Sequence, residues 1–92
     1  YLKQERANAY LDGILTALRP DDICIDCGAN VGKITTRLAG TGATVHAFEP
    51  DPIAFAELEK NVAERDNVSI VPGVCLPAGS AHADQGRNDQ EE

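Results

Sequence analysis

The chain of 92 residues carries eight basic and fifteen acidic side chains, a formal net charge of -7 and 42% hydrophobic residues. These values indicate one small globular domain, because compact domains usually have about 100–150 residues and disordered acidic chains contain fewer apolar ones. No apolar run is long enough to cross a membrane, and the acidic balance disfavours nucleic-acid binding, which relies on clustered Lys and Arg. We expect a cytosolic protein that binds neither membrane nor nucleic acid and is a piece of a longer one.

The amino-terminal segment is predicted to form an amphipathic helix. From Leu2 to Leu18, apolar residues recur every three or four positions, which is the spacing of one helix face. This stripe consists of Ala7, Leu11, Ile14, Leu15 and Leu18. The pair Arg19-Pro20 ends the helix, because a residue before proline avoids the helical backbone conformation. We therefore assign residues 1–19 to a helix that precedes the sheet.

The central segment, residues 20–75, alternates short apolar runs with helical ones. Strands are predicted over residues 23–26, 43–48 and 68–71, and the first has the continuous apolar character of a buried parallel strand. The helix after the first strand is expected to end at the glycines of residues 40–42. Its predicted core stripe comprises Val31, Ile34, Thr35 and Leu38.

A third helix is predicted to begin at Pro52, with Asp51 as its N-cap, and to end before Asp66-Asn67. The alternation of helices and strands predicts an α/β fold in which about three parallel strands are joined by right-handed crossovers. Residues 76–92 are polar and lack apolar periodicity, so we predict a disordered carboxyl-terminal tail.

Three cysteines raise the question of a metal or disulfide site. Cys24 and Cys27 form a C-x-x-C motif, but strand geometry directs their side chains to opposite faces. Zinc would need two further ligands, and the remaining histidines and Cys75 are not at ligand spacing. We therefore predict no metal site and expect these cysteines to act as small buried hydrophobic residues.

The loop after the first strand, DCGANVG at residues 26–32, carries the strongest functional signal. Glycines there allow a sharp turn and close approach to a ligand, and the following helix offers free N–H groups. Glu49 lies at the carboxyl end of the next predicted strand, where an acidic side chain can accept hydrogen bonds from two ribose hydroxyls. The two features predict one ligand crevice above the strand ends.

Three ligands compete for this loop. A dinucleotide site requires G-x-G-x-x-G, but Asn30 and Lys33 occupy the second and third glycine positions. A P-loop requires four residues between its glycines and a hydroxyl after the lysine, whereas Gly28 and Gly32 are closer and Ile34 follows the lysine. S-adenosylmethionine has a ribose and an amino-acid tail but no phosphate, so the departures from the phosphate motifs do not count against it.

The residues of these motifs resemble a known family. The run from Ile25 to Gly32, the segment from Ala47 to Pro52, and then Leu58 and Asn61 are similar to the FkbM-type family of S-adenosylmethionine-dependent methyltransferases. The resemblance covers about residues 20 to 73. It implies a partial Rossmann-like fold of the class I methyltransferases, and it favours S-adenosylmethionine over NAD. An NAD-binding Rossmann domain is the distant third interpretation, after the methyltransferase and a non-catalytic half-domain.

The resemblance also implies roles for individual residues. Gly28 and Gly32 would shape the turn beneath the methionine moiety, and Asn30 would contribute its backbone and its amide. Asp26 would contact the amino-acid end of the cofactor, directly or through water, and Glu49 would hold the ribose. Taken singly from the residues, Asp26 could instead cap the next helix and Glu49 could be a solvated strand end.

The family pattern continues with a fourth strand bearing Lys and acidic residues, which does not follow Gly73 in this sequence. Acceptor recognition and any general base would come from that part, so we assign no catalytic residue. We expect the cofactor-binding half of an O-methyltransferase that acts on a small molecule or a sugar. The alternative is a non-catalytic half-domain, either a degenerate product or a module that binds a nucleotide-like ligand or another chain.

The predicted sheet has an open edge beside its first strand. Ile23 and Ile25 would be left with unpaired backbone and exposed apolar surface there. A domain this small buries only about 60% of its unfolded surface. We therefore expect marginal stability, self-association through the open edge and weak cofactor binding.

Overall fold

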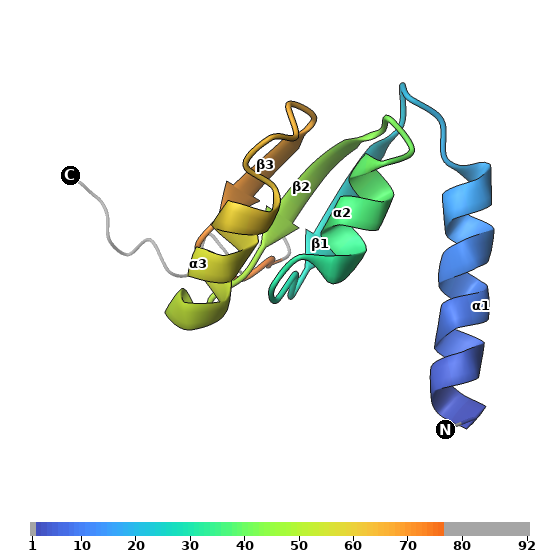
Figure 1. Ribbon diagram of the computed structural model, residues 1–92, viewed down its shortest axis with the longest axis horizontal. Coiled ribbons are helices and arrows are strands. Elements are labelled where there is room, and N and C mark those ends of the chain that lie inside the picture. The colour runs from blue at the N-terminus through green and yellow to red at the C-terminus, as the bar shows by residue number, and fades with distance from the viewer. Residues whose placement is uncertain (1, 77–92) are drawn as a thin grey trace.

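In a computed structural model, residues 2–76, with side chains from residue 5 onward, form helices alternating with strands (Figure 1). The elements are α1 (Leu2–Ala17), β1 (Ile23–Cys27), α2 (Lys33–Ala39), β2 (Thr44–Phe48), α3 (Pro52–Asn61) and β3 (Val68–Val71). Each strand lies within one residue of its predicted bounds. Residues 77–92 of the predicted tail lie outside the described part, so its disorder stays a prediction.

The three strands form one parallel sheet in the order β1-β2-β3, as the alternation predicted. In this register Ile25 is opposite His46, and Ala47 is opposite Ile70. Consecutive parallel strands joined by right-handed crossovers place both connecting helices on the same face. Accordingly, α2 and α3 cover one face of the sheet (Figure 1).

The core lies between these helices and the sheet. Val45, Ala47 and Leu58 are completely buried. Ala47 and Leu58 belong to one cluster with Val62 of the turn after α3, and Val45 belongs to a second cluster with residues of α2. Partly buried residues of β1 and β3 pack against these clusters. The core is therefore aliphatic and consists of a single layer between the sheet and the two helices.

The start of α3 agrees with the prediction. The side chain of Asp51 accepts a hydrogen bond from the Ala54 amide at 3.2 Å, and Pro52 occupies the first turn. The helix ends at Asn61, earlier than the predicted break at Asp66-Asn67. Asn67 has a role that the sequence did not predict: its side-chain NH₂ group donates hydrogen bonds to the Ala39 and Ala43 carbonyls, both at 2.8 Å.

The predicted core stripe of α2 is only partly correct. Thr35 and Leu38 are buried, but Ile34 is 48% exposed and Val31 lies in the loop before the helix. The helix begins only at Lys33 and packs on β2 through its carboxyl-terminal half, which includes Ala39. Its first turn therefore lies at the carboxyl end of the sheet, where Ile34 lines a cavity instead of the core.

The stripe of α1 is also only partly used for packing. Leu15 and Leu18 pack against the cluster around Val45, whereas Ile14 is 51% exposed and Ala7 is exposed. The helix stands beside α2, and only its carboxyl-terminal end reaches the core (Figure 1). Within the described residues, no helix is long and apolar enough to cross a membrane.

The sheet face opposite α2 and α3 is bare among the described residues, and β1 forms an open edge. Ile23 and Ile25 project from this face of β1 and are 68% and 59% exposed, and Val71 of β3 is 41% exposed. We call the face formed by Ile23, Ile25 and Val71 the bare sheet face. Unpaired strand edges and contiguous apolar surface both favour association.

We therefore predict that the chain of 92 residues self-associates and that Ile25→Lys shifts it toward the monomer. A lysine on the edge strand opposes pairing through charge and hydration. Sedimentation velocity over a range of protein concentrations measures the change. Ile53→Lys is the matched control, because Ile53 on α3 is 78% exposed and lies away from the sheet edge. Equal effects of both substitutions, or a wild-type chain monomeric throughout, would contradict the prediction.

Candidate functional site

The loop between β1 and α2 has a backbone that only particular residues tolerate. Gly28, Asn30 and Gly32 adopt φ values of 76°, 57° and 96°. Glycine has no Cβ to clash in this region, and asparagine visits it more readily than most residues do. The amides of Gly28 and Ala29 both donate to the Phe48 carbonyl, at 2.9 and 3.0 Å. These bonds fasten the loop to the end of β2.

The loop also packs closely against α3. A Cβ atom on Gly32 would lie 2.9 Å from Leu58 Cδ1, so a larger residue does not fit without movement. The Asn61 side-chain amide donates to the Val31 carbonyl at 2.6 Å. Gly32 therefore permits both the turn and the contact with α3, which is a role in shaping the loop. Asn61 also binds the loop to α3 through its hydrogen bond.

Glu49 lies immediately after β2 and is only 7% exposed. Its Oε1 accepts a hydrogen bond from the backbone N–H of Asn30 at 2.7 Å, and its Oε2 accepts one from the backbone N–H of Asp51 at 2.9 Å. It is therefore not a solvated strand end, which was one interpretation of the sequence. Each carboxylate oxygen can accept a second hydrogen bond, so capacity for a ligand hydroxyl remains.

Asp26, near the end of β1, is half-buried and bonded to α2. Its Oδ2 accepts a hydrogen bond from Thr35 Oγ1 at 2.6 Å, and Thr35 is completely buried. The N-cap of α2 is Gly32, which forms no side-chain cap, so Asp26 does not cap that helix. Within residues 5–76, Asp26 Oδ1 has no hydrogen-bond partner. One carboxylate oxygen is thus held in place and the other is available.

A cavity of about 250 Å³ lies between the loop and the first turn of α2. It is lined by Asp26, Gly28, Ala29, Asn30, Val31, Lys33 and Ile34. The structure therefore brings three of the predicted site residues, Asp26, Gly28 and Asn30, to one cavity. Gly32 and Glu49 do not line it. Gly32 packs against Leu58 of α3, and Glu49 accepts a hydrogen bond from the backbone N–H of Asn30, so both hold the loop in place. This cavity is the candidate ligand site.

Sequence reasoning missed three residues of this site. Ile34 was assigned to the core and Lys33 was considered as a departure from the glycine motif, but both line the cavity. Thr35 was assigned to the apolar stripe, where a hydroxyl among aliphatic residues is itself a signal, since a buried polar group needs a partner. Asp26 is that partner. Only the packing of α2 against β1 makes the pairing visible.

The cysteines differ from the expectation of burial. Cys24 is half-buried and packs against the Val45 cluster, whereas Cys27 is exposed at the end of β1. A side-chain hydrogen bond with Cys75 raises the pKa of the Cys27 thiol, and burial, then the charges of Asp22 and Asp26, raise the pKa of Cys24. A raised thiol pKa disfavours the deprotonated, reactive thiolate form. Among the described residues, no three His, Cys, Asp or Glu side chains are grouped to hold a metal ion.

The chain is similar in sequence to methyltransferases that act on different substrates. The 31-O-demethyl-FK506 methyltransferase FkbM of Streptomyces tacrolimicus is 50% identical over 46 residues, which are 48% of this chain and 18% of that protein. The ribosomal RNA small subunit methyltransferase A of Moorella thermoacetica is 40% identical over 57 residues, 62% of this chain and 20% of that protein. The chain thus spans a fifth or less of either relative. No family model matches it.

Solved structures show the same fold. SMU.1697c of Streptococcus mutans, in complex with SAH, has a TM-score of 0.68 and 20% identity, covering 74% of this chain and 40% of that one. TYW2 of P. horikoshii, in complex with MeSAdo, has a TM-score of 0.62 and 26% identity, covering 68% and 26%. The chain therefore has a partial Rossmann-like methyltransferase fold and resembles the amino-terminal part of class I S-adenosylmethionine-dependent methyltransferases. The likeness is wider than the FkbM-type family.

Proposed function

We propose that the chain is the cofactor-binding part of an S-adenosylmethionine-dependent methyltransferase, with Asp26, Gly28, Asn30, Gly32 and Glu49 forming the site. One contact carries this proposal: the hydrogen bond of 2.7 Å that the backbone N–H of Asn30 donates to Glu49 Oε1. It joins the glycine loop to the acidic residue at the end of the neighbouring strand. Those are the two features that a ligand with both an amino-acid tail and a ribose requires.

The residues present fit this cofactor in chemistry and in part in volume. The free oxygen of Asp26 suits the ammonium group of the amino-acid tail, and the second lone pairs of Glu49 suit ribose hydroxyls. The cavity of about 250 Å³ is smaller than typical ligand pockets, which have volumes of about 300–1,000 Å³. It therefore accommodates the amino-acid end, and the nucleoside would extend along the strand ends toward Glu49.

The chain's own residues would position the cofactor rather than react. When bound, S-adenosylmethionine supplies an electrophilic methyl group, and the acceleration of such a transfer depends strongly on holding donor and acceptor in register. Thr35 fixes the Asp26 carboxylate at 2.6 Å, and Phe48 fixes the loop amides. These contacts preorganise the loop. We assign no catalytic residue among them.

For the acceptor we propose O-methylation of a small molecule or a sugar. The 50% identity to the FkbM protein supports this choice, and so does the net charge of -7, which opposes binding of a polyanion. The likeness to the ribosomal RNA methyltransferase A supports RNA as the second candidate. A non-catalytic nucleotide-binding module is the third. A cytosolic location remains our prediction.

Calorimetric titration of the chain with S-adenosylmethionine, S-adenosylhomocysteine and NAD tests the cofactor. We expect both sulfur compounds to bind and NAD not to bind, because the loop lacks the second glycine that a pyrophosphate needs. Asp26→Asn should weaken binding of both sulfur compounds about tenfold or more, since it removes a charge-assisted hydrogen bond. Ser69→Ala is the control, because Ser69 lies on β3, bonds to His46 and does not line the cavity. Binding of NAD alone, or of none of the three, would contradict the proposal.

A further inference from the structure

A groove of about 400 Å³ lies between α1 and α2, beside the cofactor cavity. It is lined by Ala7, Asn8, Leu11, Lys33, Ile34 and Arg37. Lys33 and Ile34 line the cofactor cavity as well, so the two spaces are neighbours that share a wall. Anything bound in the groove would lie directly beside the ligand of the cavity.

The groove accounts for the amino-terminal part of the α1 stripe. Leu15 and Leu18 pack on the core, but the same apolar face continues toward the amino terminus with Leu11 and Ala7, which contact no core cluster. An apolar helix face is stabilised only when something covers it. Here Leu11 and Ala7 form one wall of the groove, and Ile34, which is 48% exposed, belongs to the other.

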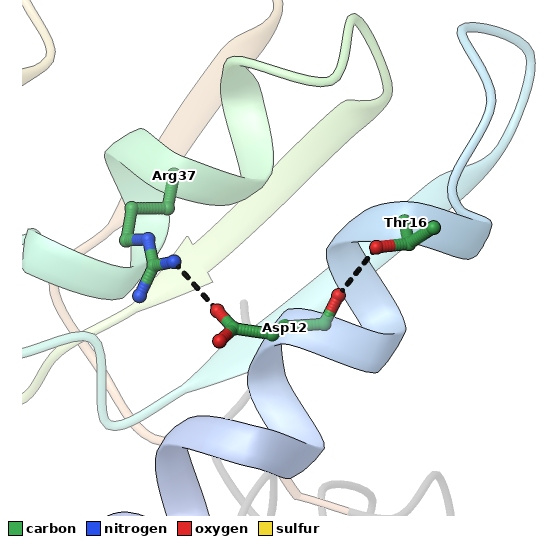
Figure 2. Close-up of polar contacts among 3 residues, drawn as sticks. All are labelled: Asp12, Thr16 and Arg37. Carbon is green, nitrogen blue, oxygen red and sulfur yellow. Dashed lines mark hydrogen bonds and ion pairs between the residues drawn. The ribbon is translucent and has the colours of Figure 1, made fainter.

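An ion pair connects the two walls. Arg37 of α2 donates to Asp12 of α1 at 2.9 Å, and Thr16 donates to the Asp12 backbone carbonyl at 2.8 Å (Figure 2). This bridge joins α1 at Asp12, which directly follows Leu11, to α2 at Arg37, which lies one helical turn after Lys33. Lys33, by contrast, makes no ion pair or hydrogen bond through its side chain within residues 5–76.

The charges of the groove differ from those of the whole chain. The chain has eight basic residues against fifteen acidic ones, yet two of the basic residues line this one groove. Of the two basic residues that line the groove, Arg37 pairs with Asp12 and Lys33 makes no ion pair among the described residues, while Asp26 lines the neighbouring cavity together with Lys33. A ligand suited to these walls has an apolar body for Leu11 and Ile34 and an anionic group for Lys33.

The family resemblance placed acceptor recognition beyond Gly73; from the groove we propose instead that residues of α1 and α2 bind the methyl acceptor, and that the acceptor is a small amphipathic anion carrying a carboxylate or a phosphate. The inference rests on the proposed methyltransferase function, because only that function requires a second ligand beside the cofactor. The volume of 400 Å³ lies in the range of small-molecule sites. The net charge of -7 favours a small anion over a nucleic acid.

Saturation-transfer difference NMR tests the groove with the chain of 92 residues, and it works for self-associated as well as monomeric protein. The probes are phenyl phosphate, benzoate and the benzyltrimethylammonium cation. We expect one or both anions to bind and the cation not to bind, and the stronger anion identifies the headgroup. Leu11→Glu should weaken anion binding by about fivefold or more, because it places a like charge on the apolar wall. Lys33→Gln should weaken it about threefold to tenfold.

Two controls keep the result specific. Ile53→Glu makes a matched apolar-to-acidic change on α3, and Lys60→Gln removes a lysine that is paired with Glu57. Neither should alter anion binding more than twofold. Binding of the cation, equal effects of Leu11→Glu and Ile53→Glu, or tighter Leu11-independent binding of an RNA oligonucleotide would overturn the inference. Titration of the wild-type chain with S-adenosylhomocysteine separates the two proposals. If the wild-type chain binds S-adenosylhomocysteine but neither anion, only the groove proposal is overturned. If it does not bind S-adenosylhomocysteine, the cofactor site is overturned.

Discussion

Replacement of Gly32 by alanine should lower the free energy of unfolding by about 2–4 kcal/mol, one of the two largest effects expected for a single substitution. The residue has a φ of 96°, which a Cβ atom opposes, and the added atom would lie 2.9 Å from Leu58 Cδ1. Leu58 is completely buried, so it has little room to move. Backbone strain and overpacking therefore act together. Urea denaturation followed by circular dichroism, at one fixed protein concentration, measures the change.

Two other glycines separate the contributions. Gly28 has a φ of 76°, but a Cβ atom added to it would meet no atom within 4 Å, so Gly28→Ala should show the strain alone, about 1–2 kcal/mol. Gly13 lies in α1 with open space around it, and Gly13→Ala should stabilise the chain by about 0.5–1 kcal/mol. If Gly32→Ala cost no more than Gly28→Ala, the close packing of the loop on α3 would be wrong.

Glu49→Ala is expected to reduce both stability and cofactor affinity. Its carboxylate accepts hydrogen bonds from the Asn30 and Asp51 amides at 2.7 and 2.9 Å, and the side chain is buried. Alanine would leave both N–H groups without this acceptor, at a cost of about 2–5 kcal/mol in unfolding free energy. Loss of the ribose contacts should weaken S-adenosylmethionine binding by about 1.5–3 kcal/mol, or roughly tenfold to 150-fold. Thermal denaturation and calorimetry measure the two effects separately.

The conservative variant Glu49→Gln separates the two roles of this residue. Its amide retains one acceptor oxygen, so about half of the stability loss should be recovered. Glu57→Ala on α3 is the control, because the exposed pair of Glu57 with Lys60 at 3.3 Å contributes only about 0–1 kcal/mol. A variant Glu49→Ala that loses stability but retains full cofactor affinity, measured where it is folded, would show that Glu49 shapes the loop without contacting the ribose.

Much of the site could be anticipated because its signals are local. The glycines of the loop identify a backbone with positive φ, and Gly28 and Gly32 have it. Asp51 before Pro52 identifies a helix start, and the structure confirms it. The position of Glu49 at a strand end also follows from the pattern of the neighbouring strand. Each of these inferences depends on a few adjacent residues and on the geometry of one turn.

Other features of the site could not be anticipated because they depend on distant residues. Ile34 was expected in the core, since its spacing from Leu38 suits one helix face, but α2 starts late and packs only through its second half. Cys27 was expected to be buried, yet the face of β1 on which it lies is bare among the described residues. Local periodicity indicates an apolar face, but it does not predict how much of that face packs against another element.

The sequence by itself determined the order and type of the elements and the placement of the glycine loop between β1 and α2, because periodicity, prolines and glycines act over a few residues. Only the tertiary structure decided that Thr35 holds Asp26 and that Glu49 joins Asn30 to Asp51. It also decided that Ala7 and Leu11, the amino-terminal part of the α1 stripe, form one wall of a groove. The reason is physical: right-handed crossovers bring separate strand ends and helix faces together, and the resulting contacts depend on packing between segments that no local pattern connects.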